Sequence, residues 1–340
     1  MSVSRRTVLR FAATAPAASL LTRIAPADAA TTLKISHQFP GGTIDQGDFR
    51  DRLCRKFAAE VTKATNGEVE FQIYPGSSMM KTNAQFSALR KGALDLSLFP
   101  ISYAGGEIKE VNIGLMPALV PTYEEAAKWK TAKVGQELAR ILGDKGVVMV
   151  SWVWQAGGMA SRGEPIVDPD DSKGKKIRGG SREMDLMLSK AGAAVVSLPS
   201  SEVYVAMQTG AIDAALTSST SLISFRLEEV SKGLTAGHGK SYWFMLEPLI
   251  MSKIVFDGLP KNQQDAIMAA GAGVEGFGTQ SAQADDEEVV AVFKKAGAKV
   301  ADMTEATIEK WRTIAADSAW KDYAEKSESC ANLLKLAEAV

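Results

Sequence analysis

The chain has 340 residues, which is long enough for two domains that each have their own hydrophobic core. It is 46% hydrophobic and 23% charged, a composition typical of globular proteins and not of disordered or fibrous ones. Its formal net charge is −1, and this becomes −4 without residues 1–29, which hold four Arg and one Asp. A mildly acidic chain without a basic cluster argues against nucleic acid or an anionic membrane surface as a partner.

The first 29 residues have the order of an export signal. Residues 4–10, SRRTVLR, resemble a twin-arginine motif, an Ala-rich apolar stretch follows at 11–21, and Ala27-Asp28-Ala29 provides a cleavage site. Because a bilayer span needs about 20 apolar residues, this stretch is too short to remain in the membrane. We therefore expect export by the twin-arginine route and a mature protein that is free in the periplasm.

Motifs for cofactors, metals and catalysis are absent from the sequence. It contains no G-x-S-x-G, H-E-x-x-H, P-loop or strand-linked G-x-G-x-x-G pattern. The two histidines, His37 and His238, and the two cysteines, Cys54 and Cys330, are too few and too scattered for a metal site. An oxidising compartment would permit a disulfide, but we interpret the cysteines as two small buried hydrophobic residues. We expect no cofactor, no metal and no enzyme.

The mature chain begins with an α/β pattern. The spacing of apolar residues predicts a strand at 33–36, a helix over 47–64 and a strand at 68–74. The segment Tyr74-Pro75-Gly76-Ser77-Ser78 then leads into a second helix, the turn Gly92-Ala93-Leu94-Asp95 and an apolar strand at 96–99.

The same order recurs 118 residues later. Leu198-Pro199-Ser200-Ser201 precedes a helix at 202–209, the turn Gly210-Ala211-Ile212-Asp213 and an apolar strand at 214–217. We expect the serines to cap the helices and the glycines to end them in the left-handed conformation. Two similar α/β units in an exported chain favour a two-lobed cleft binder with a hinge, although two common βαβ units could also match by chance.

The remaining segments connect and cover these two units. Residues 147–154 form a strand-like run that enters the hinge, and residues 245–253 return to the first lobe. Helices are expected at 285–296, 305–316 and 322–339. We therefore assign lobe 1 to 30–153 and 216–255, the core of lobe 2 to 154–215, and C-terminal helices to 256–340.

The most informative stretch is residues 173–218. It holds the run Lys175-Lys176-Ile177-Arg178, two glycines, a helix, a strand and the second copy of the repeated unit. This order resembles the second lobe of the DctP-type solute receptors of TRAP transporters. The resemblance implies an α/β fold of two lobes with a hinge and a helical C-terminal tail that packs over both lobes. It also implies a periplasmic receptor that delivers a solute to the small and large membrane subunits of the transporter.

Within this resemblance, Arg178 is the expected carboxylate clamp. A guanidinium is a planar, permanently charged fork that matches a carboxylate with two hydrogen bonds. The sequence departs from the family pattern at two places. A second arginine expected near Gly158 is missing, and Thr217 stands where many members have Asn.

The other expected ligand-binding residues are polar or aromatic side chains near the predicted cleft. His37 follows the first strand, and Gln155 lies at the predicted crossing between the lobes. Aromatic and sulfur side chains are abundant there, although core packing is their usual role. The expected set is Arg178, Trp154, Thr217, Gln155, His37, Phe99, Trp243 and Met80. With few polar groups and many rings, it favours an apolar-bodied monocarboxylate, such as an aromatic or 2-oxo acid.

Two other classes remain open from the sequence. A binding protein of an ABC importer or a periplasmic sensor would share the cleft, and periodicity alone does not separate them from a TRAP receptor. A periplasmic enzyme is a distant alternative, because no acid–base pair of side chains can be assigned.

Overall fold

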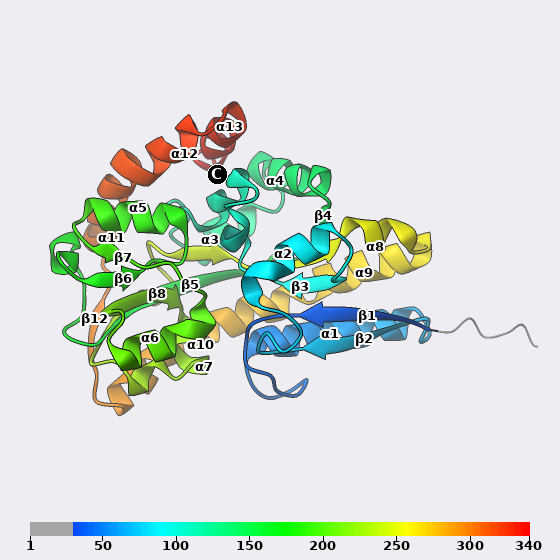
Figure 1. The fold of residues 1–340 in the computed structure, drawn as a ribbon, viewed down its shortest axis with the longest axis horizontal. Helices are drawn as coiled ribbons and strands as arrows, with labels where there is room; N and C mark the ends of the chain where they lie inside the picture. Colours follow the sequence, from blue (N-terminus) through cyan, green and yellow to red (C-terminus); the bar gives the residue numbers. More distant parts are fainter. Residues whose placement is uncertain (1–29) are drawn as a thin grey trace, which may run out of the picture.

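Two mixed β-sheets organise the protein (Figure 1), and the computed structural model describes residues 30–340. The twin-arginine signal predicted within 1–29 lies outside the described residues. The first sheet has the order β2 (Val69–Tyr74), β1 (Thr31–Ser36), β3 (Leu96–Leu98), β11 (Leu249–Ser252), β4 (Val147–Met149). The second has the order β12 (Lys299–Asp302), β9 (Gly233–Ala236), β5 (Trp154–Ser161), β8 (Ala214–Ser218), β6 (Lys176–Arg178), β7 (Ala194–Val195), with β10 (Phe244–Leu246) also paired to β5.

Lobe 1 is built around the five-stranded sheet. Its helices are α1 (Phe49–Ala64), α2 (Thr82–Arg90), α3 (Tyr123–Lys128) and α4 (Lys133–Asp144). Helix α1 buries the face formed by Phe49, Leu53, Phe57 and Val61, as the 3–4 residue spacing of these side chains predicts. Asp48 caps this helix by accepting the backbone N–H of Arg50.

Lobe 2 is built around the second sheet, with helices α5 (Arg182–Lys190), α6 (Val203–Thr209) and α7 (Ser219–Ser224). The chain passes from lobe 1 to lobe 2 between β4 and β5 and returns between β10 and β11. The predicted boundary at residue 216 is therefore wrong, because β8 and β9 pair with β5 in the second sheet. This boundary is set by strand pairing between segments that are distant in the sequence, so local periodicity cannot predict it.

The repeated unit occurs once in each lobe. Gly92 (φ 69°) and Gly210 (φ 77°) both have the left-handed conformation predicted for them. Asp95 Oδ2 accepts the backbone N–H of Lys34 at 2.7 Å, and Asp213 Oδ2 accepts that of Lys176 at 2.8 Å. The two carboxylates therefore perform the same task, tying the end of the turn to a neighbouring strand.

The predicted serine caps are wrong. Helix α2 begins after Lys81 and helix α6 after Glu202, and neither helix has a side-chain cap. Ser77 instead hydrogen-bonds Thr82 through its hydroxyl, and Ser200 opens a short 3₁₀ turn.

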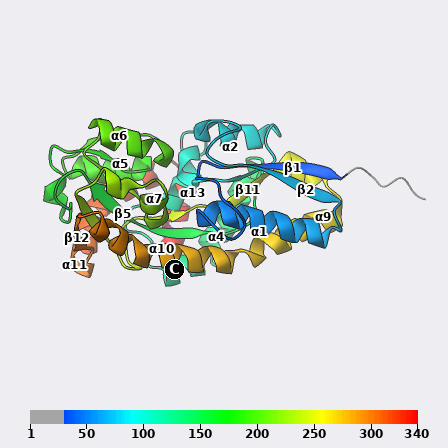
Figure 2. The ribbon, with the colours of Figure 1, turned by 90° about the horizontal axis from the view of Figure 1, so that it is seen from below.

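The C-terminal helices pack over both lobes, as predicted. They are α8 (Lys253–Gly258), α9 (Lys261–Gly273), α10 (Glu275–Lys295), α11 (Glu305–Ala315), α12 (Lys321–Glu325) and α13 (Glu328–Ala337). Helix α10 runs beneath both lobes and packs on α1 and on α7 and β5 (Figure 2). Helix α11 packs on α5 in lobe 2, and α13 packs on α4 in lobe 1. In the described part of the chain, no helix combines the length and apolarity needed to cross a membrane.

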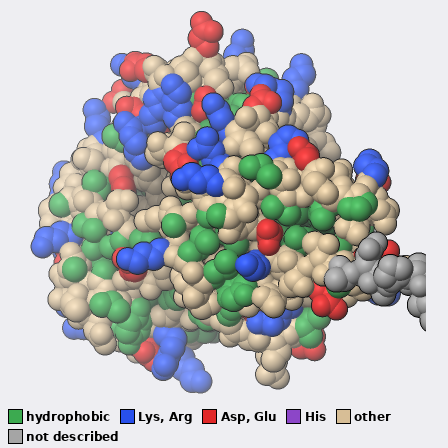
Figure 3. All heavy atoms as spheres, turned by 45° about the vertical axis from the view of Figure 1, so that its right-hand side comes forward, with side chains coloured by type: hydrophobic (Ala, Val, Ile, Leu, Met, Phe, Trp, Pro, Cys, Tyr) green, Lys and Arg blue, Asp and Glu red, His purple; other side chains and the backbone are tan. Residues whose placement is uncertain are grey.

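The surface in Figure 3 mixes charges of both signs. Ion pairs such as Arg140 with Glu137 and Lys253 with Asp257 contribute to this mixture, as the near-neutral net charge predicts.

If the C-terminal helices are an integral part of the fold, truncating their buried side chains must destabilise the whole protein. Leu333→Ala removes a fully buried side chain of α13 and is expected to cost about 2–5 kcal/mol of the free energy of unfolding, measured by urea denaturation. Val205→Ala is the control, because Val205 is 59% exposed, and its effect should stay within about 0.5 kcal/mol. Equal effects of the two substitutions would contradict an integral tail.

Candidate ligand-binding site

Arg178 is a buried cation at the junction of the lobes. It ends β6 and is only 1% exposed. Its guanidinium donates to Leu198 O at 2.9 Å, to Leu216 O at 2.8 Å and to the Tyr103 hydroxyl at 2.6 Å. These three acceptors are neutral, and no carboxylate of the described residues lies within ion-pair distance of Arg178. A guanidinium has five N–H donors, so a buried charge with spare donors remains for an anion.

The glycine pair after Arg178 makes room for the guanidinium itself. Gly180 has φ 96°, and a Cβ atom built there would lie 2.8 Å from Arg178 Nη1. The carbonyl of Gly179 accepts the indole N–H of Trp243 at 3.0 Å. Burial raises the pKa of the neighbouring Asp185 to about 6 although the charge of Arg178 opposes the change, and Asp185 accepts the N–H of Gly179.

Tyr103 connects the two lobes at this point. It belongs to a 3₁₀ turn of lobe 1, Ile101–Ala104, and its ring meets Phe99 edge to face at 6.1 Å. Its hydroxyl accepts from Arg178 and also from the backbone N–H of Ser200 at 3.0 Å, and both donors are in lobe 2. The neighbouring Ser102 donates to Gly180 O at 3.3 Å.

A pocket of about 490 Å³ opens between the lobes beside these contacts. Lobe 1 lines it with Asn83, Asn112 and residues 102–103 and 105–107, and lobe 2 lines it with residues 180–182 and 197–199. Tyr103 and Leu198, which both accept from the Arg178 guanidinium, are in its wall, and so is Gly180 beside them. The candidate site is therefore an inter-lobe cleft with Arg178 at its inner edge.

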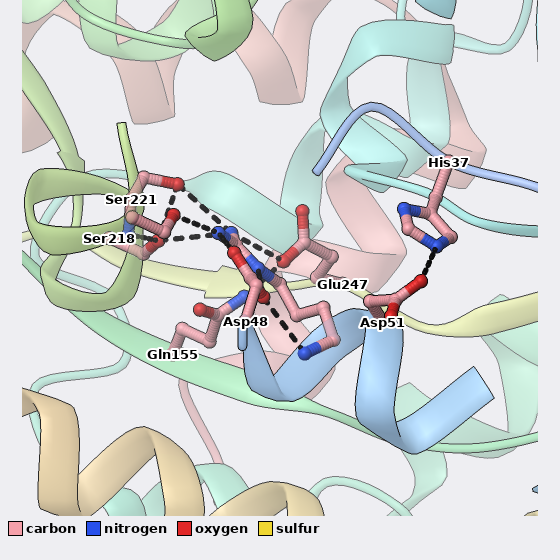
Figure 4. A network of polar contacts seen from close by, with 9 residues as sticks. His37, Asp48, Asp51, Gln155, Ser218, Ser221 and Glu247 are labelled. Atoms are coloured by element: carbon pink, nitrogen blue, oxygen red, sulfur yellow. Dashed lines mark hydrogen bonds and ion pairs between the residues drawn. The ribbon is translucent and has the colours of Figure 1, made fainter. Parts of the chain in front are cut away.

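A second arginine, Arg50, joins the lobes in a fully paired network (Figure 4). Its guanidinium holds both oxygens of Asp48, at 2.9 and 2.7 Å. It also donates to Ser221 Oγ of lobe 2 at 2.9 Å, and lies 3.5 Å from Glu247 Oε2. Its charge is thus shared among carboxylates, unlike that of Arg178, and its role is to connect α1 with lobe 2.

Glu247 is the buried carboxylate at the crossing between the lobes. Burial raises its pKa to about 7, even though Arg50 lies beside it and opposes the change. Gln155 donates its side-chain N–H to the same oxygen that faces Arg50.

His37 directly follows β1, as predicted, and is fully buried. Its Nε2 lies 3.1 Å from Asp51 Oδ1, and its ring stacks on Phe39 at 5.7 Å. Burial acts to raise the pKa of Asp51, but hydrogen bonds from His37, Arg55 and Gly42 outweigh it and hold the pKa below its usual value.

The structure brings together only part of the predicted set. Trp243 lies next to Arg178, because its indole donates to Gly179 O, and Phe99 packs on Tyr103. Thr217 is in strand β8, and the preceding residue of that strand, Leu216, accepts a hydrogen bond from Arg178. His37 and Gln155 belong to the Arg50 region. Trp154 instead packs on Trp129 and lines a different, smaller pocket, and Met80 packs half-buried against the core ahead of α2. Contact of each of these side chains with a ligand stays a prediction.

Sequence reasoning missed Arg50 and Glu247 as members of this region. Arg50 stands in the first turn of an amphipathic helix, where arginines usually face solvent, and its partner Ser221 is 171 residues away. Nothing in the local pattern distinguishes it from Arg52 or Arg55.

Comparison with known proteins agrees with this architecture. The family model DctP, described as bacterial extracellular solute-binding protein, family 7, matches residues 47–327. A solute-binding protein of Albidiferax ferrireducens is 65% identical over 308 residues, 91% of each chain. The 2,3-diketo-L-gulonate-binding periplasmic protein of Escherichia coli is 27% identical over 263 residues, 76% of this chain and 79% of that one.

A solved structure resembles this fold closely. It is a TRAP periplasmic solute-binding protein from Rhodoferax ferrireducens with bound malonate, with a TM-score of 0.89 and 65% identity over 90% of this chain and 97% of that one. Two α/β lobes around a cleft define a solute receptor of the periplasmic binding type. The chain belongs to the DctP family, the periplasmic solute-binding proteins of TRAP transporters.

Loss of Arg50 is expected to destabilise the fold strongly, because Asp48 and Glu247 would be left buried without their cation. Arg50→Ala should cost about 3–5 kcal/mol in urea denaturation. Arg140→Ala is the matched control: Arg140 also pairs with two carboxylates, but on the surface, so a much smaller cost is expected. If Arg50→Ala cost no more than the control, the network would not hold the lobes together.

The raised pKa of Glu247 predicts a pH dependence of stability. The folded pKa of about 7 lies above the reference value of 4.5, so the folded state binds this proton more tightly than the unfolded chain does. Its contribution is therefore complete below about pH 4.5 and is lost as the pH rises through 7, by up to about 3 kcal/mol. Urea denaturation between pH 5 and 8 should show a smaller loss for Glu247→Gln than for the unaltered protein. Parallel curves would contradict the assignment to Glu247.

Proposed function

We propose that this protein is a periplasmic receptor that captures a small organic acid in the inter-lobe cleft, with the solute's carboxylate on Arg178. It then delivers the solute to the small and large membrane subunits of a TRAP transporter. The observation that carries this proposal is the buried guanidinium of Arg178, which has neutral partners and spare donors beside an inter-lobe pocket.

A carboxylate is the ligand that this arrangement suits best. Two parallel N–H···O bonds from a guanidinium to a carboxylate give both charge pairing and orientation, and the low dielectric of a buried site strengthens them. The malonate bound to the 65% identical relative is a small dicarboxylate, so it presents the same group. The affinity of the solute for the closed state over the open state is then what drives closure of the lobes.

The chemistry of the cleft favours one carboxylate on the solute over two. Arg178 is the one guanidinium of the cleft without a carboxylate partner among the described residues, because Arg50 is already paired with Asp48 and Glu247. The rings of Tyr103 and Phe99 beside it would cover an apolar part of the solute. An aromatic or 2-oxo acid stays a sequence-based prediction, which a thermal-shift screen of organic acids decides.

Arg178→Ala is expected to weaken solute binding by about 2–5 kcal/mol, because it removes a buried charge-assisted pair. The measurement is calorimetry with the acid that gives the largest thermal shift in a screen of mature protein. Arg226→Ala is the control, since Arg226 is also in lobe 2 but pairs with Glu229 at the surface and does not line the pocket. An unchanged affinity in Arg178→Ala, or an equal loss in the control, would overturn the assignment of the clamp.

A further inference from the structure

The phenolic hydrogen of Tyr103 has no acceptor among the described residues. The phenolic oxygen receives two hydrogen bonds, from Arg178 Nη2 at 2.6 Å and from the backbone N–H of Ser200 at 3.0 Å. A guanidinium and a backbone amide only donate, so neither contact uses the hydrogen that the tyrosine itself carries. The hydroxyl of Tyr103 is therefore fully used as an acceptor and unused as a donor.

Contacts from both lobes hold this hydroxyl in place. The ring of Tyr103 packs edge to face on Phe99 of lobe 1 at 6.1 Å, and Arg178 Cζ of lobe 2 lies 5.9 Å from the centre of the ring. The neighbouring Ser102 donates to Gly180 O across the same junction at 3.3 Å. Because packing fixes the ring and two donors fix the oxygen, an acceptor for the hydrogen has to come to Tyr103.

Tyr103 is also within reach of a solute. It lines the inter-lobe pocket of about 490 Å³ and is half-buried, whereas Arg178 is only 1% exposed. Among the described residues that line this pocket, Glu107 is the one carboxylate, and it is paired with Arg90 at 2.9 Å. The wall of the pocket thus offers the hydrogen of Tyr103 no free carboxylate, and a solute in the pocket can supply one.

A carboxylate suits a guanidinium and a phenol that stand side by side. Its two oxygens are adjacent, so one can accept a spare N–H of Arg178 while the other accepts the O–H of Tyr103. Hydrogen bonds to an ionised acceptor are shorter and about twice as strong as those between neutral groups. A primary amide of the same shape would turn its own N–H toward one of the two donors, so this pair of donors discriminates against it.

We infer that Tyr103 is a specificity-determining residue, which donates its phenolic hydrogen to the solute carboxylate that Arg178 holds. This inference rests on the proposed function and adds to it an uncharged donor from the opposite lobe. Tyr103 belongs to lobe 1 and Arg178 to lobe 2, so the carboxylate joins the two lobes directly. Recognition of the carboxylate and closure of the lobes are then one event.

The test measures binding of malonate, the acid bound to the 65% identical relative, and of malonamide, its neutral diamide. If malonate gives no thermal shift, the acid with the largest shift in the screen and the amide of that acid replace the pair. Calorimetry serves for the acid, and NMR titration of the mature protein reaches the weaker binding of the amide.

Tyr103→Phe is the informative variant, because it removes the hydroxyl and keeps the ring that packs on Phe99. We expect its affinity for malonate to fall by about tenfold or more, since a charge-assisted hydrogen bond is lost. The ratio of malonate affinity to malonamide affinity should fall by about fivefold or more, because an amide gains less from the same donor. Tyr204→Phe is the matched control: the phenol of Tyr204 pairs with Glu229 at the surface, away from the pocket, and its loss should change neither value.

Three outcomes would overturn the inference. An unchanged or higher affinity of Tyr103→Phe for malonate would mean that the phenol only competes with the solute for Arg178. An equal loss for malonate and malonamide would mean that Tyr103 serves only as a contact between the lobes. A comparable loss in Tyr204→Phe would mean that the effect is not specific to the pocket.

Failure of this inference is distinguishable from failure of the proposed function. If Arg178→Ala abolishes malonate binding and Tyr103→Phe leaves it unchanged, the clamp stands and the role of Tyr103 falls. If Arg178→Ala leaves the affinity unchanged, the proposed function of Arg178 falls, whatever the result for Tyr103→Phe.

Discussion

A guanidinium buried between two lobes is the constraint on which the rest of this structure depends. Such a charge is stable only where acceptors surround it, and the protein meets this requirement in two different ways. Arg50 is neutralised by Asp48 and Glu247 and tied to lobe 2 through Ser221. Arg178 is surrounded by two carbonyls and a phenol, which accept one hydrogen bond from each of its three nitrogens but do not neutralise its charge. The Arg50 network connects the two lobes, whereas the charge of Arg178 remains available to pair with an anion.

The sheet next to Arg178 explains why a second cleft arginine is missing near Gly158. A Cβ atom at Gly158 would lie 2.6 Å from Thr235 O, and one at Gly157 would lie 2.4 Å from the ring of Trp243. Strand β5 is thus packed too closely between β8 and β9 to carry a side chain there. The Trp243 indole fills the space over Gly157, and the other buried arginine of the region, Arg50, comes from the opposite lobe.

Much of the fold was predictable from the sequence because its causes are local. The apolar face of α1, the left-handed glycines at 92 and 210 and the equivalent aspartates at 95 and 213 all follow from spacing and turn chemistry. The assignment of 216–236 to lobe 1 was wrong because strand pairing over long separations decides it. The Arg50 network was not predictable for the same reason: Asp48 is adjacent, but Ser221 and Glu247 come from segments far along the chain. Arg178 could be singled out only through the resemblance of its surrounding motif to a known family.

Tyr103 has a consequence for the competition at Arg178. Its phenolic oxygen accepts from Arg178 and from the Ser200 amide, so a residue of lobe 1 already holds two donors of lobe 2. A solute carboxylate bound as proposed would have to share or displace this phenol. The affinity of the receptor is then a difference between the free energy that the carboxylate gains on Arg178 and the free energy that the phenol gives up. Removing the hydroxyl would make Arg178 more accessible but would also remove a contact between the lobes.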